Sequence, residues 1–469
     1  MKTQKNLALP ELSIDQQRAA HYAYLGEVMP ELVARLAWSR AQIDAYQTQV
    51  FRDFLRHVKA HSPWHAKRAA HLDPATATPA DLASLPIMDK NDMMDNWDAI
   101  VTVPGASRLE AEEALRAHTD QFYIWGDNVL LASGGSGGRP GLFLYDWFGM
   151  AMLWGGMGRG FYSSLSALAK QGIDLPGGVR MCSVAAEKSA HGSYILSRVF
   201  SNPNNPTHRL SGWRSNEDVI AKLNAIQPHF IFCYPTLIHE LAEAANSGQL
   251  KIEPSVIYLG SEHLSDTVRD LARRTWPGTA ILTCWGTSEG GGTFPCPCGD
   301  GFHVCEDLCI IEPVDSRGRP VPPGQRAHGI YFTNLFNKAL PIIRYFIDDI
   351  FEMAEGPCAC GSHFLKVRQV HGRTLDNFYY GDIAILPVTL ELAVLEQPSV
   401  LEYQIRQTPR GAHLVYRSIN DVDEARLHRK MHDTLVNCGL QAPEITIERA
   451  DTMKRTAAGK LIRFVPLPQ

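Results

Sequence analysis

Apolar and polar positions follow two alternating rhythms between residues 216 and 290. One rhythm repeats every three to four positions and predicts amphipathic helices, whereas the other is a short apolar run that predicts a buried strand. The helical segments are 216–226, 236–245 and 265–276, and the strand segments are 229–235, 255–260 and 279–285. Strands that alternate with helices build a parallel sheet covered by helices, so this part of the chain predicts an α/β fold.

Two polar motifs lie at the ends of predicted strands. They are Gly-Ser-Glu at 260–262 and Trp-Gly-Thr-Ser-Glu at 285–289. Ligands of open parallel sheets bind beyond the carboxyl ends of the strands. A lone glutamate at a strand end is usually a loop residue, but two in successive strand–helix units indicate a binding site.

A glycine-rich stretch at 133–140, Ser-Gly-Gly-Ser-Gly-Gly-Arg-Pro, joins two apolar segments at 129–131 and 142–145. The flanking segments predict a strand before the loop and a strand after it. Backbone N–H groups in such a loop, together with its hydroxyls and its arginine, suit the binding of phosphates. The alternative is a flexible turn without a ligand.

Better-known glycine signatures fit this stretch less well. A Walker loop ends in Gly-Lys-Ser/Thr, whereas Gly138 is followed by Arg139 and Pro140, and Pro140 also breaks the dinucleotide signature. Gly134-x-Ser136-x-Gly138 matches the nucleophile elbow of serine hydrolases, but that elbow opens a helix. A serine hydrolase built on Ser136 therefore stays a remote alternative.

The other segments add helices before the sheet and a small unit after it. Residues from about 11 to 60 have helical spacing. The aromatic, Met-rich segment 147–161 is either a buried helix or the wall of an apolar ligand pocket. Segment 329–349 predicts a strand, a turn and another strand, and residues from 377 onward predict a small α+β unit.

Composition narrows the class of protein. The chain has 469 residues, of which 45% are hydrophobic and 20% charged, as is typical of a globular protein of two or three lobes. A formal net charge of −5 gives no basic field that would attract nucleic acid. No apolar run approaches the ~20 residues that span a bilayer, and the N-terminal residues lack the apolar core of a signal peptide. We expect a cytoplasmic protein without a membrane partner.

The stretch at 133–140 resembles the phosphate loop of the adenylate-forming superfamily, whose usual form is Ser-Ser-Gly-Thr-Thr-Gly-Lys-Pro. Phenylacetate-CoA ligases, which belong to that superfamily, carry Gly-Ala-Glu and Tyr-Gly-Leu-Ser-Glu at the separation of the two strand-end motifs. They also carry Leu-Pro-Val-Ile-Arg-Tyr-Arg-Thr-Arg-Asp, which is similar to Leu-Pro-Ile-Ile-Arg-Tyr-Phe-Ile-Asp-Asp at 340–349. The resemblance implies a large α/β adenylation domain and a small mobile α+β domain.

The resemblance implies a role for each motif. The Gly-Ser-Glu motif would border the adenine, Trp285 would lie against the nucleotide, and Ser288 would meet the phosphate or carboxylate region. Glu289 would hold Mg²⁺, which carboxylates and phosphate oxygens bind together. Asp349, or Asp348 beside it, would accept the ribose hydroxyls. The implied nucleotide contacts are Ser133, Ser136, Gly138, Arg139, Gly260, Ser261, Glu262, Trp285, Gly286, Thr287, Ser288, Asp349 and Arg373.

The same resemblance implies a hinge and a mobile lysine. Gly-Arg-Thr-Leu-Asp at 372–376 resembles the family's Gly-Arg-Ser-Asp-Asp hinge, with Leu375 in place of the first aspartate. Lys460 lies in a stretch similar to Pro-Lys-Thr-x-Ser-Gly-Lys-Ile-x-Arg and would bridge the substrate carboxylate and the α-phosphate. His191 would lie near that carboxylate. The implied domains are 1–372, with a helical extension and a zinc-site insertion, then the hinge 373–376 and a small domain 377–469.

Six of the ten cysteines fall into two groups, which indicates a metal rather than a disulfide framework. Cys298, His303, Cys358 and Cys360 would close a tetrahedral structural zinc site, with Cys296 as the substitute for Cys298. Several phenylacetate-CoA ligases show the same pattern. Free surface thiols are the alternative, and Cys305 and Cys309 are expected to face the core of a strand at 303–314.

The implied reaction joins an aryl or other apolar carboxylic acid to ATP, forming an acyl-AMP, and then transfers the acyl group to coenzyme A. A carrier-protein thiol or an amine could serve as acceptor instead, and a homodimer is left open. A zinc-containing binding protein that has lost catalysis is a rival hypothesis, because the phosphate loop and the hinge depart from the family pattern.

Overall fold

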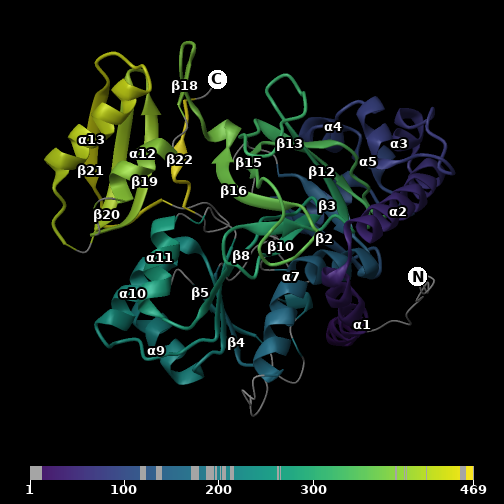
Figure 1. Ribbon diagram of the computed structural model, residues 1–469, viewed down its shortest axis with the longest axis horizontal. Coiled ribbons are helices and arrows are strands. Elements are labelled where there is room, and N and C mark those ends of the chain that lie inside the picture. Colours follow the sequence, from purple (N-terminus) through teal and green to yellow (C-terminus); the bar gives the residue numbers. More distant parts are fainter. Residues whose placement is uncertain are drawn as a thin grey trace.

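A parallel sheet of five strands forms the part of the molecule that carries the strand-end motifs (Figure 1). Its strand order is β5-β4-β6-β7-β8, and all neighbouring pairs are parallel, which confirms the α/β prediction for 216–290. The strands are β4 (Met181–Ala185), β5 (His208–Ser211), β6 (Phe230–Cys233), β7 (Val256–Leu259) and β8 (Ala280–Thr283). The helices between them are α9 (Asn216–Ile226), α10 (Ile238–Asn246) and α11 (Asp266–Thr275).

The structure is a computed structural model. It describes residues 13–116, 123–133, 140–170, 179–185, 195, 198–200, 202, 207–211, 216–260, 264, 266–385, 388–395, 397, 399–418, 420–454 and 461–467.

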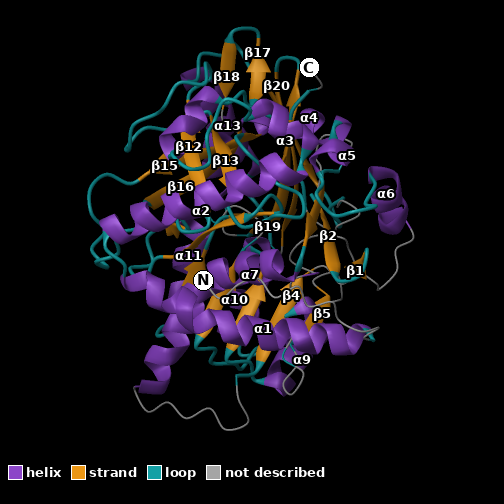
Figure 2. Ribbon diagram, turned by 90° about the vertical axis from the view of Figure 1, so that its right-hand side faces the viewer, coloured by secondary structure: helices purple, strands orange, loops and turns teal. Residues whose placement is uncertain are grey.

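Helices dominate the N-terminal part of the chain. The two long ones, α1 (Ile14–Ala34) and α2 (Arg40–His61), each begin with a capping box in which a serine and the glutamine three residues later bond reciprocally. Helix α2 lies outside the strands (Figure 2), where its Phe51 and Phe54 pack with Leu335 and Ile343. The shorter helices are α3 (Pro63–Arg68), α4 (Lys90–Asp95), α5 (Trp97–Ile100) and α6 (Arg108–Arg116).

The predicted strand–loop–strand arrangement around the glycine-rich stretch is present. Strands β2 (Asn128–Ala132) and β3 (Leu142–Tyr145) pair antiparallel, with β1 (Tyr123–Ile124) at the edge beside β2. The long helix α7 (Trp147–Lys170) follows, and its first half is largely buried. A strand after the loop, in place of a helix, removes the geometry that a serine hydrolase elbow needs.

Two further sheets complete the large domain. The first has the order β15-β16-β11-β10-β9 and the second β12-β13-β14. Their strands are β9 (Gly286–Thr287), β10 (Gly291–Pro295), β11 (Phe302–Val304), β12 (Cys309–Val314), β13 (Gly329–Asn334), β14 (Tyr345–Ile347), β15 (Asp349–Met353) and β16 (Lys366–Arg373).

The C-terminal residues form a separate unit with its own buried core, which includes Phe378, Ile405, Leu414 and Leu427. A 3₁₀ turn at Thr374–Asp376 precedes this unit. Its elements are β17 (Phe378–Tyr380), β18 (Ile383–Ile385), α12 (Val388–Leu395), β19 (Val400–Thr408), β20 (Gly411–Ser418), α13 (Glu424–Asn437), β21 (Glu444–Arg449) and β22 (Phe464–Val465). Among the described residues, no helix is both long and apolar enough to cross a membrane.

Candidate active site and metal centre

The Trp-Gly-Thr-Ser-Glu motif forms a tight hairpin immediately after β8. Strand β9 turns back and pairs with β10, so Thr287 lies opposite Gly291. Gly292 has a left-handed φ of 135°, and a side chain there would collide with the indole ring of Trp285. Gly292 therefore serves packing, because it leaves room for the large aromatic ring.

Trp285 contacts the residue that the resemblance assigns to the ribose. Its indole Nε1 donates a hydrogen bond to Asp349 Oδ2 at 2.8 Å, and its ring packs edge-on against Phe351. Arg373 Nε lies 3.5 Å from Asp349 Oδ1, because β15 and β16 place the two residues opposite each other. Burial raises the pKa of the Asp349 carboxyl, and the charge of Arg373 opposes that rise. The carboxylate is thus fixed in orientation before any ligand binds.

Glu289 lies close to this group. Its carboxylate accepts a hydrogen bond from the Thr287 hydroxyl, and its backbone carbonyl accepts one from Asn334 Nδ2 at 3.0 Å. Burial raises the pKa of the Glu289 carboxyl, the charge of Arg373 lowers it and that of Asp349 raises it. Two carboxylates and one guanidinium therefore lie within electrostatic reach of one another.

The strand that follows the glycine-rich loop is joined to the same hairpin. Tyr145 at the end of β3 donates its hydroxyl proton to the Ser288 carbonyl at 2.5 Å. At the base of the loop, Ser133 N donates to Gly141 O, and Gly141 N donates to the Ser133 hydroxyl at 2.8 Å. No motif marked Tyr145 or Asn334, because each is the last residue of a strand whose earlier residues are mostly apolar.

Helix α7 borders the site on its apolar side. Met157 packs so closely on Gly286 that a side chain at Gly286 would lie 2.7 Å from the Met157 sulfur. Gly260, after β7, is likewise pressed against the ring of Phe232. Nearby, Tyr258 donates its hydroxyl proton to the Cys284 sulfur at 2.5 Å. The Met-rich segment is thus a buried helix, and it also lies against the Trp-Gly-Thr-Ser-Glu motif.

Several residues singled out in the sequence lie outside the described part of the chain. They are Ser136, Gly138, Arg139, His191, Ser261, Glu262 and Lys460.

Three cysteines and a histidine converge where strands β10 and β11 meet the loop before β16. Ligand atoms of Cys296, His303, Cys358 and Cys360 all lie within 4.8 Å of one another. His303 Nδ1 lies 3.0 Å from the Phe364 carbonyl, and Nε2 lies 3.2 Å from the Cys360 sulfur. A histidine that donates its Nδ1 proton to a carbonyl offers Nε2 to a metal, which is the usual arrangement of a ligand histidine.

This cluster corrects one detail of the expected metal set. Cys298 is exposed and groups with Cys296 and Asp300, not with His303, Cys358 and Cys360. Cys296, the substitute, takes the fourth place. The tight turn after β10 explains the exchange: Cys296 N donates a hydrogen bond to Gly301 O and Cys296 is buried, whereas Cys298 lies in the turn and is exposed.

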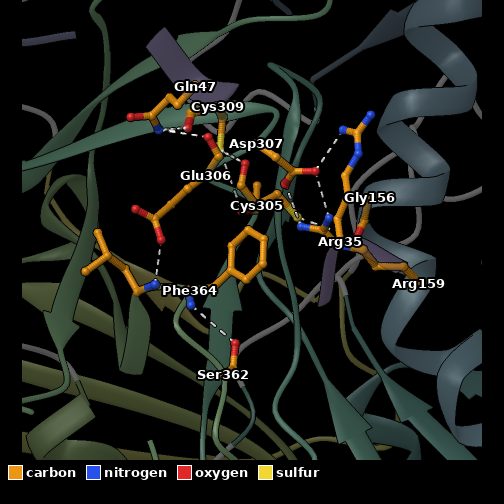
Figure 3. Close-up of polar contacts among 12 residues, drawn as sticks. Arg35, Gln47, Gly156, Arg159, Cys305, Glu306, Asp307, Cys309, Ser362 and Phe364 are labelled. Atoms are coloured by element: carbon orange, nitrogen blue, oxygen red, sulfur yellow. Dashed lines mark hydrogen bonds and ion pairs between the residues drawn. The ribbon is translucent and has the colours of Figure 1, made fainter. Parts of the chain in front are cut away.

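The expected single strand at 303–314 is also corrected. It is split into β11 and β12 by a turn that holds Glu306 and Asp307. Asp307 is fully buried and accepts hydrogen bonds from Arg159 Nη2 at 2.8 Å and Arg35 Nη1 at 3.0 Å (Figure 3). Cys305 and Cys309 are buried, as predicted. The ionic contacts of the turn outweigh the strand pattern of its apolar neighbours.

Arg344, within the similar segment 340–349, has a structural role. It pairs with Glu312 at 3.1 Å and donates to the carbonyls of Ala83 and Leu85. Its contacts join the N-terminal part of the chain to β12 and lie apart from the carboxylates of the site.

Comparison with known proteins bears on this geometry. No protein-family model matches the chain. Phenylacetate-coenzyme A ligases from Thermus thermophilus and Pseudomonas putida are 23% and 24% identical to it, covering 83% and 79% of this chain and 81% and 80% of their own lengths.

Solved structures share the fold. The 2-hydroxyisobutyryl-CoA ligase in its postadenylation state, in complex with 2-HIB-AMP, has a TM-score of 0.69 at 17% identity, covering 92% of this chain and 91% of its own. The same ligase in its thioesterification state has a TM-score of 0.56 at 18% identity, covering 92% of each chain. The chain is therefore similar in sequence to phenylacetate-coenzyme A ligases over most of its length, and it has the two-domain fold of adenylate-forming coenzyme A ligases.

Proposed function

We propose that the protein is an AMP-forming acid–thiol ligase. In the first step a carboxylate oxygen attacks the α-phosphorus of ATP, and pyrophosphate leaves. In the second step the sulfur of coenzyme A attacks the acyl carbon of the acyl-AMP, AMP leaves, and the thiol proton is lost to solvent. The observation that carries the proposal is the fixed Asp349 carboxylate beside the Trp285 hairpin, at the strand ends where a nucleotide would bind.

Each motif has a part in this proposal. The residues of the glycine-rich loop, with Arg139, hold the phosphates, and the Gly-Ser-Glu motif borders the adenine. Asp349 accepts hydrogen bonds from the ribose hydroxyls, and its contacts with Trp285 and Arg373 fix the orientation of its carboxylate. His191 lies near the acid, and Lys460 compensates the charge that develops as pyrophosphate leaves.

Two metals belong to the proposal. Glu289 supplies a carboxylate of the kind that Mg²⁺ binds together with phosphate oxygens. Three thiols and one imidazole fit a closed, structural zinc site in which Cys296, His303, Cys358 and Cys360 are the ligands. Zinc there would hold the loop at 358–360 against β10 and β11 and take no part in the reaction.

The two steps would use two arrangements of the domains. We infer a boundary at 373–376, because Arg373 ends the last strand of the large domain and the C-terminal core begins at Phe378. The better superposition on a postadenylation structure than on a thioesterification structure supports a role of the described arrangement in the first step. Rotation about the boundary would then admit the thiol.

The acid and the acceptor complete the proposal. Helix α7 and the aromatic rings of Phe161, Phe230 and Tyr258 offer apolar surface near the site, which favours an aryl or other apolar acid. Coenzyme A is the acceptor that the sequence relatives indicate, and a carrier-protein thiol or an amine stays an alternative. A pyrophosphate-release screen over a panel of carboxylic acids, with and without coenzyme A, tests both the acid and the acceptor.

Lys460→Ala gives the mechanistic test. We expect it to reduce ATP–pyrophosphate exchange by at least about a thousandfold while thioester formation from supplied acyl-AMP stays largely intact, because the lysine serves only the first step. Equal loss in both half-reactions would contradict the two-arrangement model. Absence of ATP binding by calorimetry in a zinc-loaded protein would favour a binding protein without catalysis.

A further inference from the structure

Helix α10 of the large domain contacts the sheet of the C-terminal domain through one ionic group. Arg417 on β20 donates to the carboxylates of Glu240 on α10 and Glu402 on β19, the latter at 2.8 Å. The exposed fractions of the side chains are 12% for Glu240, 26% for Arg417 and 5% for Glu402. In Figure 1 the helices α10 and α11 lie below this yellow-green sheet. The two domains thus meet at a partly buried charge group.

The two carboxylates differ in what a domain rotation does to them. Glu402 lies opposite Arg417 in the antiparallel register of β19 and β20, so their bond stays within one rigid sheet. Glu240 belongs to the other domain. Rotation of the C-terminal domain would therefore break the Arg417–Glu240 bond and keep the Arg417–Glu402 bond. A contact made in only one arrangement adds free energy to that arrangement alone.

The same sheet carries the segment that follows Lys460. Strand β22 pairs parallel with β19, Ile405 N donates to Arg463 O at 2.7 Å, and Gln404 Nε2 donates to Ile462 O at 2.7 Å. Residues 462–465 therefore move together with the sheet whose strand β20 contacts α10 through Arg417.

An electrostatic effect of the C-terminal domain is present one residue away on α10, at His239. Burial lowers the pKa of His239, and the positive charge of Arg463 lowers it further. Arg463 is part of the segment directly after Lys460, and its guanidinium donates to Glu391 at 3.0 Å. The charge of Arg463 on the C-terminal domain therefore also acts on the first turn of α10, beside the Glu240 bond.

We propose that Glu240 and Arg417 are positioning residues that hold the C-terminal domain in the arrangement serving acyl-AMP formation. They act through the sheet that carries the Lys460 segment and do not touch the reacting atoms. This inference rests on the proposed function. Loss of the contact shifts the domain equilibrium away from the first step and leaves the second step unimpaired.

The test compares Glu240→Gln with Glu243→Gln, which removes an exposed carboxylate from the same helix. We expect Glu240→Gln to lower pyrophosphate exchange about tenfold, within the usual range of coupling between two states, while thioester formation from supplied acyl-AMP is unchanged or faster. Glu240→Asp should recover part of the exchange rate, and Glu243→Gln should match the wild type. Equal losses in both half-reactions, or no change in either, would overturn the proposal.

Small-angle X-ray scattering of the substrate-free protein separates this inference from the function it rests on. At low salt, Glu240→Gln should give a radius of gyration different from that of the wild type and of Glu243→Gln, because the C-terminal domain leaves the described arrangement more often. If none of the tested acids supports pyrophosphate exchange by the wild type, the proposed function fails. An unchanged radius of gyration in Glu240→Gln would show instead that the Glu240–Arg417 contact does not set the domain arrangement. A urea-unfolding midpoint equal to that of the wild type shows that the variant is folded.

Discussion

Two buried ionic groups in this molecule have opposite compositions. Around Asp307, two arginines from α7 and from the turn after α1 bind one aspartate, and all three side chains are almost fully buried within the large domain. Around Arg417, two glutamates bind one arginine, and one of them comes from the other domain. The first group joins elements that stay together. The second crosses the boundary at which the proposed mechanism requires motion.

The difference shows that burial and location decide whether an ion pair is permanent or can break and re-form. A buried charge without a partner is costly, so the Asp307 group fixes the packing of α1, α7 and the turn before β12. A partly exposed arginine that keeps one partner can exchange the other for water at moderate cost. The Arg417 group can therefore form and break within a catalytic cycle.

The largest expected effect comes from breaking the first group. Asp307→Asn leaves Arg159 and Arg35 with a neutral partner in the core, and we expect the free energy of unfolding to fall by about 3–5 kcal/mol. Urea unfolding followed by fluorescence measures this. Asp315→Asn on the exposed turn after β12, which breaks the pair with Arg319, is the control and should change much less. Similar losses in the two variants would contradict the contrast between buried and exposed pairs.

Metal removal should have an intermediate effect, since the cysteine–histidine cluster also lies within the large domain. Elemental analysis should find one zinc ion per chain, kept in Cys298→Ser and lost in Cys296→Ser. Chelation should lower the free energy of unfolding by about 2–4 kcal/mol in the wild type and in Cys298→Ser. The radius of gyration should not change. Zinc kept by Cys296→Ser but lost by Cys298→Ser would reverse the assignment.

The smallest effect is expected at the boundary itself. Burial raises the pKa of Asp376 to about 6, against the charge of Arg373, while the charges of Asp348 and Asp349 raise it further. Because the folded state holds this proton more tightly than the unfolded state, the stabilisation is full below about pH 4 and is lost as pH rises through 6.

Asp376→Asn, which carries no charge, should remove this pH dependence. Its unfolding midpoint in urea should exceed that of the wild type at pH 7 and approach it near pH 4. A wild type whose stability relative to the variant does not fall between pH 4 and pH 7 would contradict a raised pKa of the Asp376 carboxyl.

Local patterns of apolar residues predicted many of the helices and strands. The alternation at 216–290 predicted β6, β7, β8 and their helices, because a buried strand and an amphipathic helix each need a fixed local spacing of apolar residues. The apolar runs beside the glycine-rich stretch likewise predicted β2 and β3. The strand order β5-β4-β6-β7-β8 had no such local signal, because it depends on which strands pack together over long sequence distances.

The strand predicted at 303–314 failed for a related reason. Its apolar residues favoured one continuous strand, but Glu306 pairs with Arg40 on α2, and Asp307 has buried partners on α7 and on the turn after α1. Nothing near these acids in the sequence indicates arginines more than a hundred residues away. Ionic partners from distant segments therefore determine where the predicted strand is interrupted.

The sequence by itself determined which strands end in polar motifs and which residues could serve a nucleotide, an acid and a metal, because side-chain chemistry and local periodicity are properties of short segments. Only the tertiary structure decided that Cys296 rather than Cys298 joins the cysteine–histidine cluster, that Trp285 holds Asp349, and that Arg417 meets Glu240. Those choices depend on distances of a few ångströms between distant segments, and packing of the whole chain sets such distances.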